Sequence, residues 1–517
     1  MNVTCHLTNH MLNRKIFLII AVFCVLKLTL HLIADSNSGF QGDELLHIAT
    51  GNYPSLGYME FPPVIGWLAF IQNQFHSQSV FVHHIFSHIA SLLILILIAL
   101  TTVRLGGKSK AVFIVLLCIL TAPAFGRGHQ LFQPVVFIHL FWLFSFYQLV
   151  RYVTSFDKKY LLYLTICVGF GFLTKYDILF FIAGLIGLLL NKPTRVDILQ
   201  KDIWKYILLF ILIIAPNVWW QYQHGFPVLD MFSRLYETQL DKLTILGVLE
   251  SIIISLNPIT MFFWIGGFIY MFRTKNNPTY YRPIAFTIII SLMLLALNKS
   301  KAYYMYPAMI TLMIFGSIWF EQRILSKRQW LLFPVTALLF LSGIVLIPFG
   351  LAVLPLDTFI KFAGIEKKDN RYEIEYKEYY SKSKWEKTMD GLQSVYDSLP
   401  MNERKDCLIW GKHYSQAGGV NLFRENYEMP KAISYHGSFY LWSPEKGVLP
   451  KTIIAFSNGE AGIDFFQSFF NSVVAVKQIY NPYADDEKDL WQTIYICKEP
   501  KLNFEELRTE FKTRIFE

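Results

Sequence analysis

Two adjacent acidic residues follow the first long apolar segment of the chain. Asp43 and Glu44 stand shortly after the apolar run from Ile16 to Ala34. A carboxylate at such a place meets both water and lipid, and partial burial increases its affinity for a proton, as a general base requires. Since adjacent helical residues point about 100° apart, one of the two would line a cavity while the other orients it. Asp43 and Glu44 are therefore candidate catalytic residues, although Asp43 could instead cap a short helix from Glu44 to Tyr53.

Basic and aromatic residues form a second candidate set, which could bind an anion or a sugar. Lys175 interrupts an apolar stretch, and Lys299 and Lys301 stand between two apolar runs. Cations so placed could hold the phosphate of a lipid-linked sugar and neutralise it as the sugar leaves. Snorkelling lysines and interfacial aromatic residues would account for the same pattern, so that alternative stays open. The candidate binding residues are Lys175, Lys299, Lys301, Arg127, Tyr58, His224 and Tyr304.

Histidines recur at helical spacing at the start of the second apolar run, as His83, His84 and His88. No set of carboxylates accompanies them, and the six cysteines show no metal-ligand spacing, so we expect no metal. Cys407 and Cys497 could pair as a disulfide if the end of the chain is extracytoplasmic.

Composition places the chain among polytopic membrane proteins. Of its 517 residues 54% are hydrophobic and only 16% are charged, and the mean hydropathy is +0.37. A single soluble domain does not sustain these values. The net charge of +9 is better explained by basic cytoplasmic loops than by nucleic-acid binding, because no basic-aromatic cluster is present.

Apolar segments long enough to span a bilayer predict about eleven membrane helices. With the N-terminus inside, about eighteen basic residues fall in cytoplasmic connections and about six in the opposite ones. This bias predicts that the first outer loop, residues 35–79, and everything after residue 354 lie outside the cytoplasmic membrane. The expected spans are Ile16–Ala34, Val80–Thr101, Ala111–Ala124, Leu131–Val150, Tyr160–Leu173, Ile178–Leu190, Trp204–Trp220, Ile245–Phe272, Ile284–Leu297, Ala302–Phe320 and Trp330–Gly350.

The last part of the chain is predicted to be a separate α/β domain over residues 355–517, after a membrane domain over 1–354. Hydropathy falls there and charge rises. The length suffices for one domain with its own core. Strands are expected at Cys407–Trp410, Thr452–Phe456, Val473–Ile479 and Thr493–Cys497, and helices at Trp385–Leu399 and Ala461–Phe470.

Short motifs distributed along the chain resemble those of one family. They are Gly42-Asp43-Glu44 with Gly57-Tyr58 and Pro62-Pro63, Leu173 to Tyr176, Pro216 to Gly225, Lys299 to Pro307, His413 to Gly419, and Ser434 to Trp442. In order and placement they are similar to the bacterial relatives of the dolichyl-phosphate-mannose protein mannosyltransferases. This is glycosyltransferase family 39, which also resembles the aminoarabinose transferases that modify lipid A.

The resemblance implies a GT-C fold and a polyprenyl-phosphate-linked sugar as donor, with no further cofactor and no obligatory metal. It implies an inverting transfer in which Asp43 is the general base, and Lys175 with Lys299 or Lys301 holds the lipid phosphate. Related chains often carry an acid in the stretch matching Phe132 to Trp142, where this chain has none. Glu60 or Asp177 could substitute for it.

A transporter or flippase of lipid-linked intermediates is the alternative function. Such a protein should show paired repeats and ionisable groups in the middle of its spans, whereas the candidate residues here gather at one expected face. The sequence leaves the sugar open, and the acceptor could be lipid A, a polysaccharide, a lipid or a protein.

Overall fold

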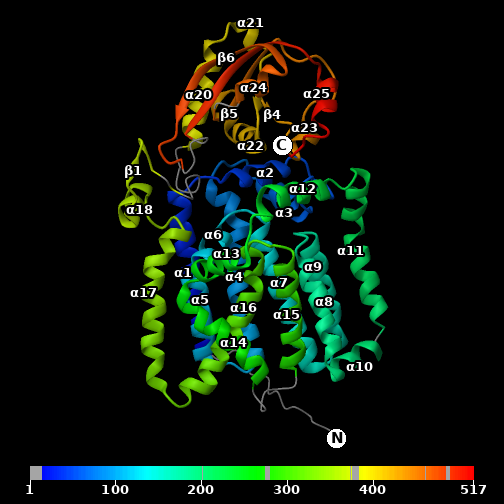
Figure 1. Cartoon of the computed structure of the whole chain (residues 1–517), viewed down its shortest axis with the longest axis vertical. Coiled ribbons are helices and arrows are strands. Elements are labelled where there is room, and N and C mark those ends of the chain that lie inside the picture. The colour runs from blue at the N-terminus through cyan, green and yellow to red at the C-terminus, as the bar shows by residue number, and fades with distance from the viewer. Residues whose placement is uncertain are drawn as a thin grey trace. The chain divides into compact units, whose positions relative to one another are not determined.

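The computed structural model describes residues 14–200, 202–273, 280–372, 374, 384–459, 462–484 and 490–516. Figure 1 labels most of its helices and strands. The chain divides into two compact units. The first consists of Met1–Leu32, Phe86–Trp220 and Leu235–Leu351, and the second of Ile33–Ile85, Gln221–Arg234 and Ala352–Glu517. The lysine at position 201 and Ala461, the first residue of an expected helix, lie outside the described residues.

The first unit is built of apolar helices. Within the described residues, six helical segments are long and apolar enough to cross a membrane, and up to nine if each of three bent helix pairs counts as one span. The six are Arg14–Asn37 (α1), Val80–Arg104 (α4), Pro134–Ser155 (α7), Ile203–Gln223 (α11), Ala302–Leu325 (α16 with η4) and Gln329–Gly350 (η5 with α17). Lys158–Phe172 (α8) and Tyr281–Leu297 (α15) are shorter helices.

Each expected span falls on a helix or a bent pair, which confirms the polytopic helical class but not uniform straight spans. Ser109–Thr121 (α5) and Pro123–Gln130 (α6) meet at 72°, because Pro123 cannot continue the hydrogen-bonded ladder of the preceding helix. Ile178–Leu190 (α9 with η1) and Lys192–Gln200 (α10) meet at 107°. Ile245–Ser255 (α13) and Pro258–Phe272 (η3 with α14) meet at 103°.

Glycines let two helices of the first unit approach closely. A Cβ on Gly267 of α14 would lie 2.0 Å from the Leu312 carbonyl oxygen, and one on Gly316 of α16 would lie 1.8 Å from that of Phe263. Small residues at membrane helix contacts permit such backbone approach.

The second unit combines the first loop with the C-terminal part of the chain. The loop forms two short helices, Gly42–Thr50 (α2) and Val64–Asn73 (α3), and residues after the long helix α11 form Pro227–Leu235 (α12). Tyr414–Phe423 (α22) packs on α2, where a Cβ on Gly418 would lie 2.8 Å from the Leu45 carbonyl oxygen. The sequence did not predict α22, because its Gly418-Gly419 pair disfavours a helix locally and is explained only by this close packing.

A mixed five-stranded sheet organises the C-terminal part in the order β4-β3-β5-β7-β6. Strand β3 is parallel to β4 and β5, whereas β7 is antiparallel to β5 and β6. All four predicted strands are confirmed, as is the helix Lys384–Ser398 (α20). The helix expected up to Phe470 is shorter, Gly462–Gln467 (α24), and Phe470 begins a strand instead. The strands are Leu408–Gly411 (β3), Ala432–Ile433 (β4), Thr452–Asn458 (β5), Phe470–Tyr480 (β6) and Trp491–Pro500 (β7).

The remaining elements of this part are small. They are Leu356–Ala363 (α18), the paired strands Lys367–Lys368 (β1) and Arg371–Tyr372 (β2), Met401–Arg404 (α21), Phe439–Trp442 (α23) and Phe504–Phe511 (α25).

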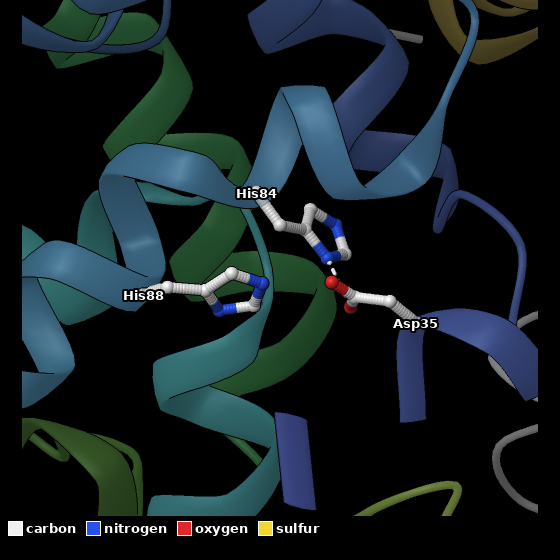
Figure 2. Close-up of side chains that lie close together, drawn as sticks. All are labelled: Asp35, His84 and His88. Carbon is white, nitrogen blue, oxygen red and sulfur yellow. Dashed lines mark hydrogen bonds and ion pairs between the residues drawn. The ribbon is translucent and has the colours of Figure 1, made fainter. Parts of the chain in front are cut away.

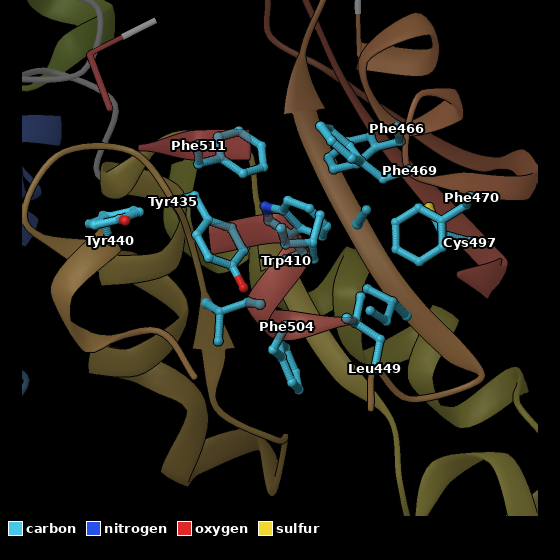
Figure 3. Packing of buried hydrophobic residues seen from close by; sticks show 14 of the residues in the cluster. Trp410, Tyr435, Tyr440, Leu449, Phe466, Phe469, Phe470, Cys497, Phe504 and Phe511 are labelled. Atoms are coloured by element: carbon cyan, nitrogen blue, oxygen red, sulfur yellow. The ribbon is translucent and has the colours of Figure 1, made fainter. Parts of the chain in front are cut away.

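An aromatic core fills one side of the sheet (Figure 3). Trp410 is completely buried at its centre and packs edge-on against Phe466 and Tyr435. Met59 of the first loop belongs to the same cluster. Cys497 lies in this core and Cys407 is also buried, but both are free thiols, so the disulfide considered from the sequence is not formed.

Candidate active site

Asp43 lies in the first turn of α2, where the exposed N–H groups of the helix favour a negative charge. Its Oδ1 accepts a hydrogen bond of 2.7 Å from the hydroxyl of Tyr414, the first residue of α22. The carboxylate is half-buried, so part of it remains open to a reactant. The N-cap of α2 is Gln41, which makes the alternative capping role of Asp43 wrong.

Glu44 performs the capping and anchors the helix. It is completely buried, and its Oε2 accepts a hydrogen bond of 2.8 Å from the Gln41 backbone N–H. Its Oε1 lies 2.6 Å from Nε2 of His84, whose Nδ1 lies 2.8 Å from Oδ1 of Asp35. Figure 2 shows the His84–Asp35 pair, with His88 on the next turn of the same helix. Asp35 and Glu44 therefore fix one imidazole between them, and α2 is held at its start.

The histidines of this region already have protein partners. Both ring nitrogens of His84 face carboxylates, and Nδ1 of His88 lies 3.2 Å from Nδ1 of His31 within the first unit. These contacts account for buried histidines at helical spacing, and the expectation of no metal stays a prediction.

Glu60 joins the first loop to the C-terminal part. Its Oε1 accepts a hydrogen bond of 2.7 Å from the Ser438 N–H, and its Oε2 one of 2.5 Å from the Ser438 hydroxyl. The same hydroxyl accepts a bond of 3.0 Å from the Met59 N–H. Burial raises the pKa of Glu60 to about 7, and the negative charge of Asp43 adds to the rise. The second carboxylate considered from the sequence thus interacts electrostatically with the first.

Tyr58 and His224 are the other candidates in the second unit. Tyr58 is buried, its hydroxyl donates to the Thr50 carbonyl oxygen at 3.3 Å, and its own carbonyl oxygen accepts from Gln221 at 3.2 Å. Burial raises the pKa of Tyr58 to about 12. The Tyr58 side chain therefore contributes to the packing of the first loop. His224 is exposed.

In the first unit, Lys175 lies in an aromatic and acidic setting at the junction of α8 and α9. Its Nζ is 3.4 Å from Oδ2 of Asp177 and 3.7 Å from the centre of the Tyr304 ring. Burial disfavours its charge, but Asp177 and Tyr304 outweigh that effect and raise the pKa of Lys175. The lysine therefore stays cationic. Lys175 and Tyr304, predicted separately, form one cluster.

The remaining basic candidates are Lys299, Lys301 and Arg127. Lys299 pairs with Asp241 at 2.8 Å, and Lys301 bonds to Gln239. Arg127 is half-buried on α6. Their roles in phosphate binding stay predictions.

Tyr414, Ser438 and Asp35 are site residues that sequence reasoning missed, and His84 was considered there only as a metal ligand. Tyr414 and Ser438 lie in motifs that carried the family resemblance, so a signal was present. Spacing alone did not assign either residue a role in the site. Their partners are hundreds of positions away in the chain: 371 for Tyr414 and Asp43.

Comparisons with known proteins support the resemblance. Residues 60–220 match the family model described as dolichyl-phosphate-mannose-protein mannosyltransferase. No curated protein matches the sequence significantly. The crystal structure of ArnT from Cupriavidus metallidurans in the apo state is similar over 92% of this chain and 97% of that chain, with 11% identity and a TM-score of 0.58.

The structure of the same ArnT bound to undecaprenyl phosphate matches over the same shares of both chains, with 12% identity and a TM-score of 0.56. The chain is thus a multi-pass membrane protein with the GT-C glycosyltransferase fold, and residues 60–220 carry the sequence pattern of the dolichyl-phosphate-mannose-protein mannosyltransferase family.

Proposed function

We propose that the chain is an integral-membrane glycosyltransferase that moves a sugar from a polyprenyl-phosphate donor to a hydroxyl of a cell-envelope acceptor. The observation that carries this proposal is the half-open carboxylate of Asp43, fixed by Tyr414 at the start of α2. The GT-C fold, and the undecaprenyl phosphate bound by ArnT of the same fold, support the donor class.

In the proposed reaction, Asp43 takes the proton of the acceptor hydroxyl as that oxygen attacks the anomeric carbon from the face opposite the phosphate. The bond between the anomeric carbon and the phosphate oxygen breaks, and its electron pair leaves with the lipid phosphate. The anomeric configuration is therefore inverted. Lys175, with Lys299 or Lys301, stabilises the negative charge that develops on the leaving phosphate. Glu44 positions α2 but takes no proton.

The proposed site faces the outside of the cytoplasmic membrane. The N-terminus then lies in the cytoplasm, and the first loop and the C-terminal part lie outside. This placement suits a donor and an acceptor that both reside in the cell envelope.

Single substitutions test the proposed roles. Asp43→Asn should abolish transfer but keep donor binding, because a base acts only in the transition state. Lys175→Ala should weaken donor binding as well. Native mass spectrometry of the purified protein with polyprenyl-phosphate sugars, followed by addition of cell-envelope extract, measures binding and consumption separately.

Two exposed residues provide the controls. Asp464→Asn and Lys205→Ala remove the same groups at exposed positions and should change neither binding nor consumption. Full transfer by Asp43→Asn would contradict the assignment of the base, and absence of bound donor from the wild type would contradict the transferase itself.

A further inference from the structure

A cavity of about 140 Å³ opens in the C-terminal part of the second unit. Aromatic rings of Tyr435, Phe465 and Phe511 line it together with Lys412, His436 and Arg514. Among the described residues, none that lines it carries a carboxylate. The cavity is large enough for one small polar molecule with an apolar face.

The aromatic wall of the cavity is preformed. The rings of Tyr435 and Phe511 stack with centroids 4.9 Å apart and an interplanar angle of 8°, and Figure 3 shows the two rings together beside Trp410. Both side chains are at least nine-tenths buried in the aromatic core, so their orientation is fixed by packing. A ligand would meet a rigid surface, which reduces the entropy lost on binding.

Two cations face this small space. Lys412 directly follows strand β3, and its Nζ lies 4.8 Å from the centre of the Phe465 ring. Burial, together with the positive charge of Arg514, lowers the pKa of Lys412. Arg514 is partnered as well, because its guanidinium lies 3.7 Å from Oε1 of Glu510 in a partly exposed ion pair. An anion between the two cations would relieve their repulsion.

His436 contributes an unsatisfied polar atom. Its Nδ1 is buried and has no hydrogen-bond partner among the described residues. Such an atom costs free energy unless a ligand or water satisfies it. The cavity therefore offers two charged donors, one unpaired ring nitrogen and an aromatic wall.

We propose that this cavity binds an acidic sugar residue of the acceptor, one that carries a carboxylate or a phosphate group. The anionic group would lie between Lys412 and Arg514, as such groups pair with guanidinium and ammonium donors. The apolar face of the sugar ring would rest on the aromatic wall. This inference rests on the proposed transferase function and narrows the acceptor to an acidic glycan.

The position of the cavity relative to Asp43 supports this role. The His436 ring lies 4.8 Å from the ring of Tyr414, whose hydroxyl bonds to Asp43 at 2.7 Å. All these residues belong to the second unit. His436, which lines the cavity, is therefore connected to the proposed base through the single residue Tyr414.

Ligand-observed saturation-transfer NMR on the purified full-length protein tests the site with three probes: methyl glucuronide, glucose 6-phosphate and neutral methyl glucoside. We expect at least one acidic probe to bind about tenfold more tightly than the neutral probe, since a hydrogen bond to a charged group contributes that much. The tighter acidic probe identifies whether carboxylate or phosphate is the natural group.

Variants locate the binding. Lys412→Met should weaken acidic binding about tenfold. Lys412→Arg should retain it, and Lys446→Met, which removes an exposed lysine of the same domain, should change nothing. If Lys412→Met fails to fold, Arg514→Met provides an independent test, because it should also weaken binding of the acidic probes.

Three results would overturn the site: equal binding of acidic and neutral probes, no binding by the wild type, or unchanged binding in folded Lys412→Met and Arg514→Met. The binding assay does not depend on transferase activity. If the probes bind through Lys412 but the wild type consumes no donor, the proposed function and the acceptor role fail, and the cavity remains a binding site for acidic sugars.

Discussion

The hydroxyl of Tyr414 donates to Asp43 and holds the rotamer of the proposed base. Tyr414→Phe keeps the ring and its tilted contact with the His413 ring but loses this hydrogen bond. Misplacing a reacting group by a fraction of a bond length lowers the rate of the chemical step, so we expect kcat to fall roughly tenfold to a hundredfold. Donor KM should stay unchanged, because Tyr414 is proposed to act on the base and not on the donor.

A second tyrosine of the same domain is a matched control for Tyr414. Tyr427 donates to Asp390 at 3.1 Å, away from the proposed base. Tyr427→Phe should leave kcat unchanged. An equal fall in both variants would show a general effect on folding, and an unchanged kcat in Tyr414→Phe would show that Asp43 needs no positioning.

Glu60 makes stability depend on pH in a predictable direction. Its pKa rises from the ordinary 4.5 to about 7, so the folded state binds this proton more tightly than the unfolded chain. The stabilisation is complete below pH 4.5 and is lost as the pH rises through about 7. The unfolding temperature of the wild type should therefore fall more between pH 5 and pH 8 than that of Glu60→Gln, as thermal unfolding can measure. The exposed control Glu425→Gln should behave like the wild type. Equal falls in the unfolding temperatures of wild type and Glu60→Gln would contradict the prediction.

At the scale of elements, one turn joins the first loop to the C-terminal part. Gly437 has φ +59°, and a Cβ there would lie 1.9 Å from Oε1 of Glu60. Gly437→Ala should therefore lower the free energy of unfolding by more than the strain of a left-handed residue alone, which is about 1 kcal/mol. Gly364 has φ +64° with no atom within 4 Å of its Cβ position, so Gly364→Ala carries the strain only. Chemical denaturation should separate the two, and equal losses would mean that Glu60 moves aside freely.

Elements were predictable where local pattern and tertiary packing agree. Strand β5 contains the apolar run 453–456 and is buried along nearly its whole length, so its sequence alone indicates a central strand. The breaks between helices were harder to predict from the sequence. Asn257 turns the chain between α13 and α14 with φ +67°, caps the next residues and is completely buried, yet its neighbours are apolar enough to suggest one continuous span.

The site was predictable only in part for a similar reason. Asp43, Lys175 and Tyr304 stand out because polar groups interrupt apolar sequence. Tyr414 and Ser438 do not stand out in a polar domain, and their importance follows from contacts with the first loop. Pairings across such distances depend on how the whole chain folds, which local sequence does not specify.

At the scale of the whole molecule, the basic residues predict which side of the membrane each connection occupies. Lys327, exposed between η4 and η5, belongs to the expected cytoplasmic side, and Met401, which is 77% exposed, belongs to the outer side. On a Cys5→Ser background, a membrane-impermeant maleimide should label Met401→Cys in intact spheroplasts and Lys327→Cys only after permeabilisation. Background labelling at Cys407 and Cys497 should be low, because both are buried.

The labelling result also tests the proposed reaction. Asp43 and the C-terminal domain belong to one unit, so an outer C-terminal domain implies an outer base. Labelling of Lys327→Cys in intact cells, or protection of Met401→Cys, would reverse the orientation and place the proposed base on the cytoplasmic side. An acceptor in the outer envelope would then be out of its reach, and the acceptor class would have to be a cytoplasmic one.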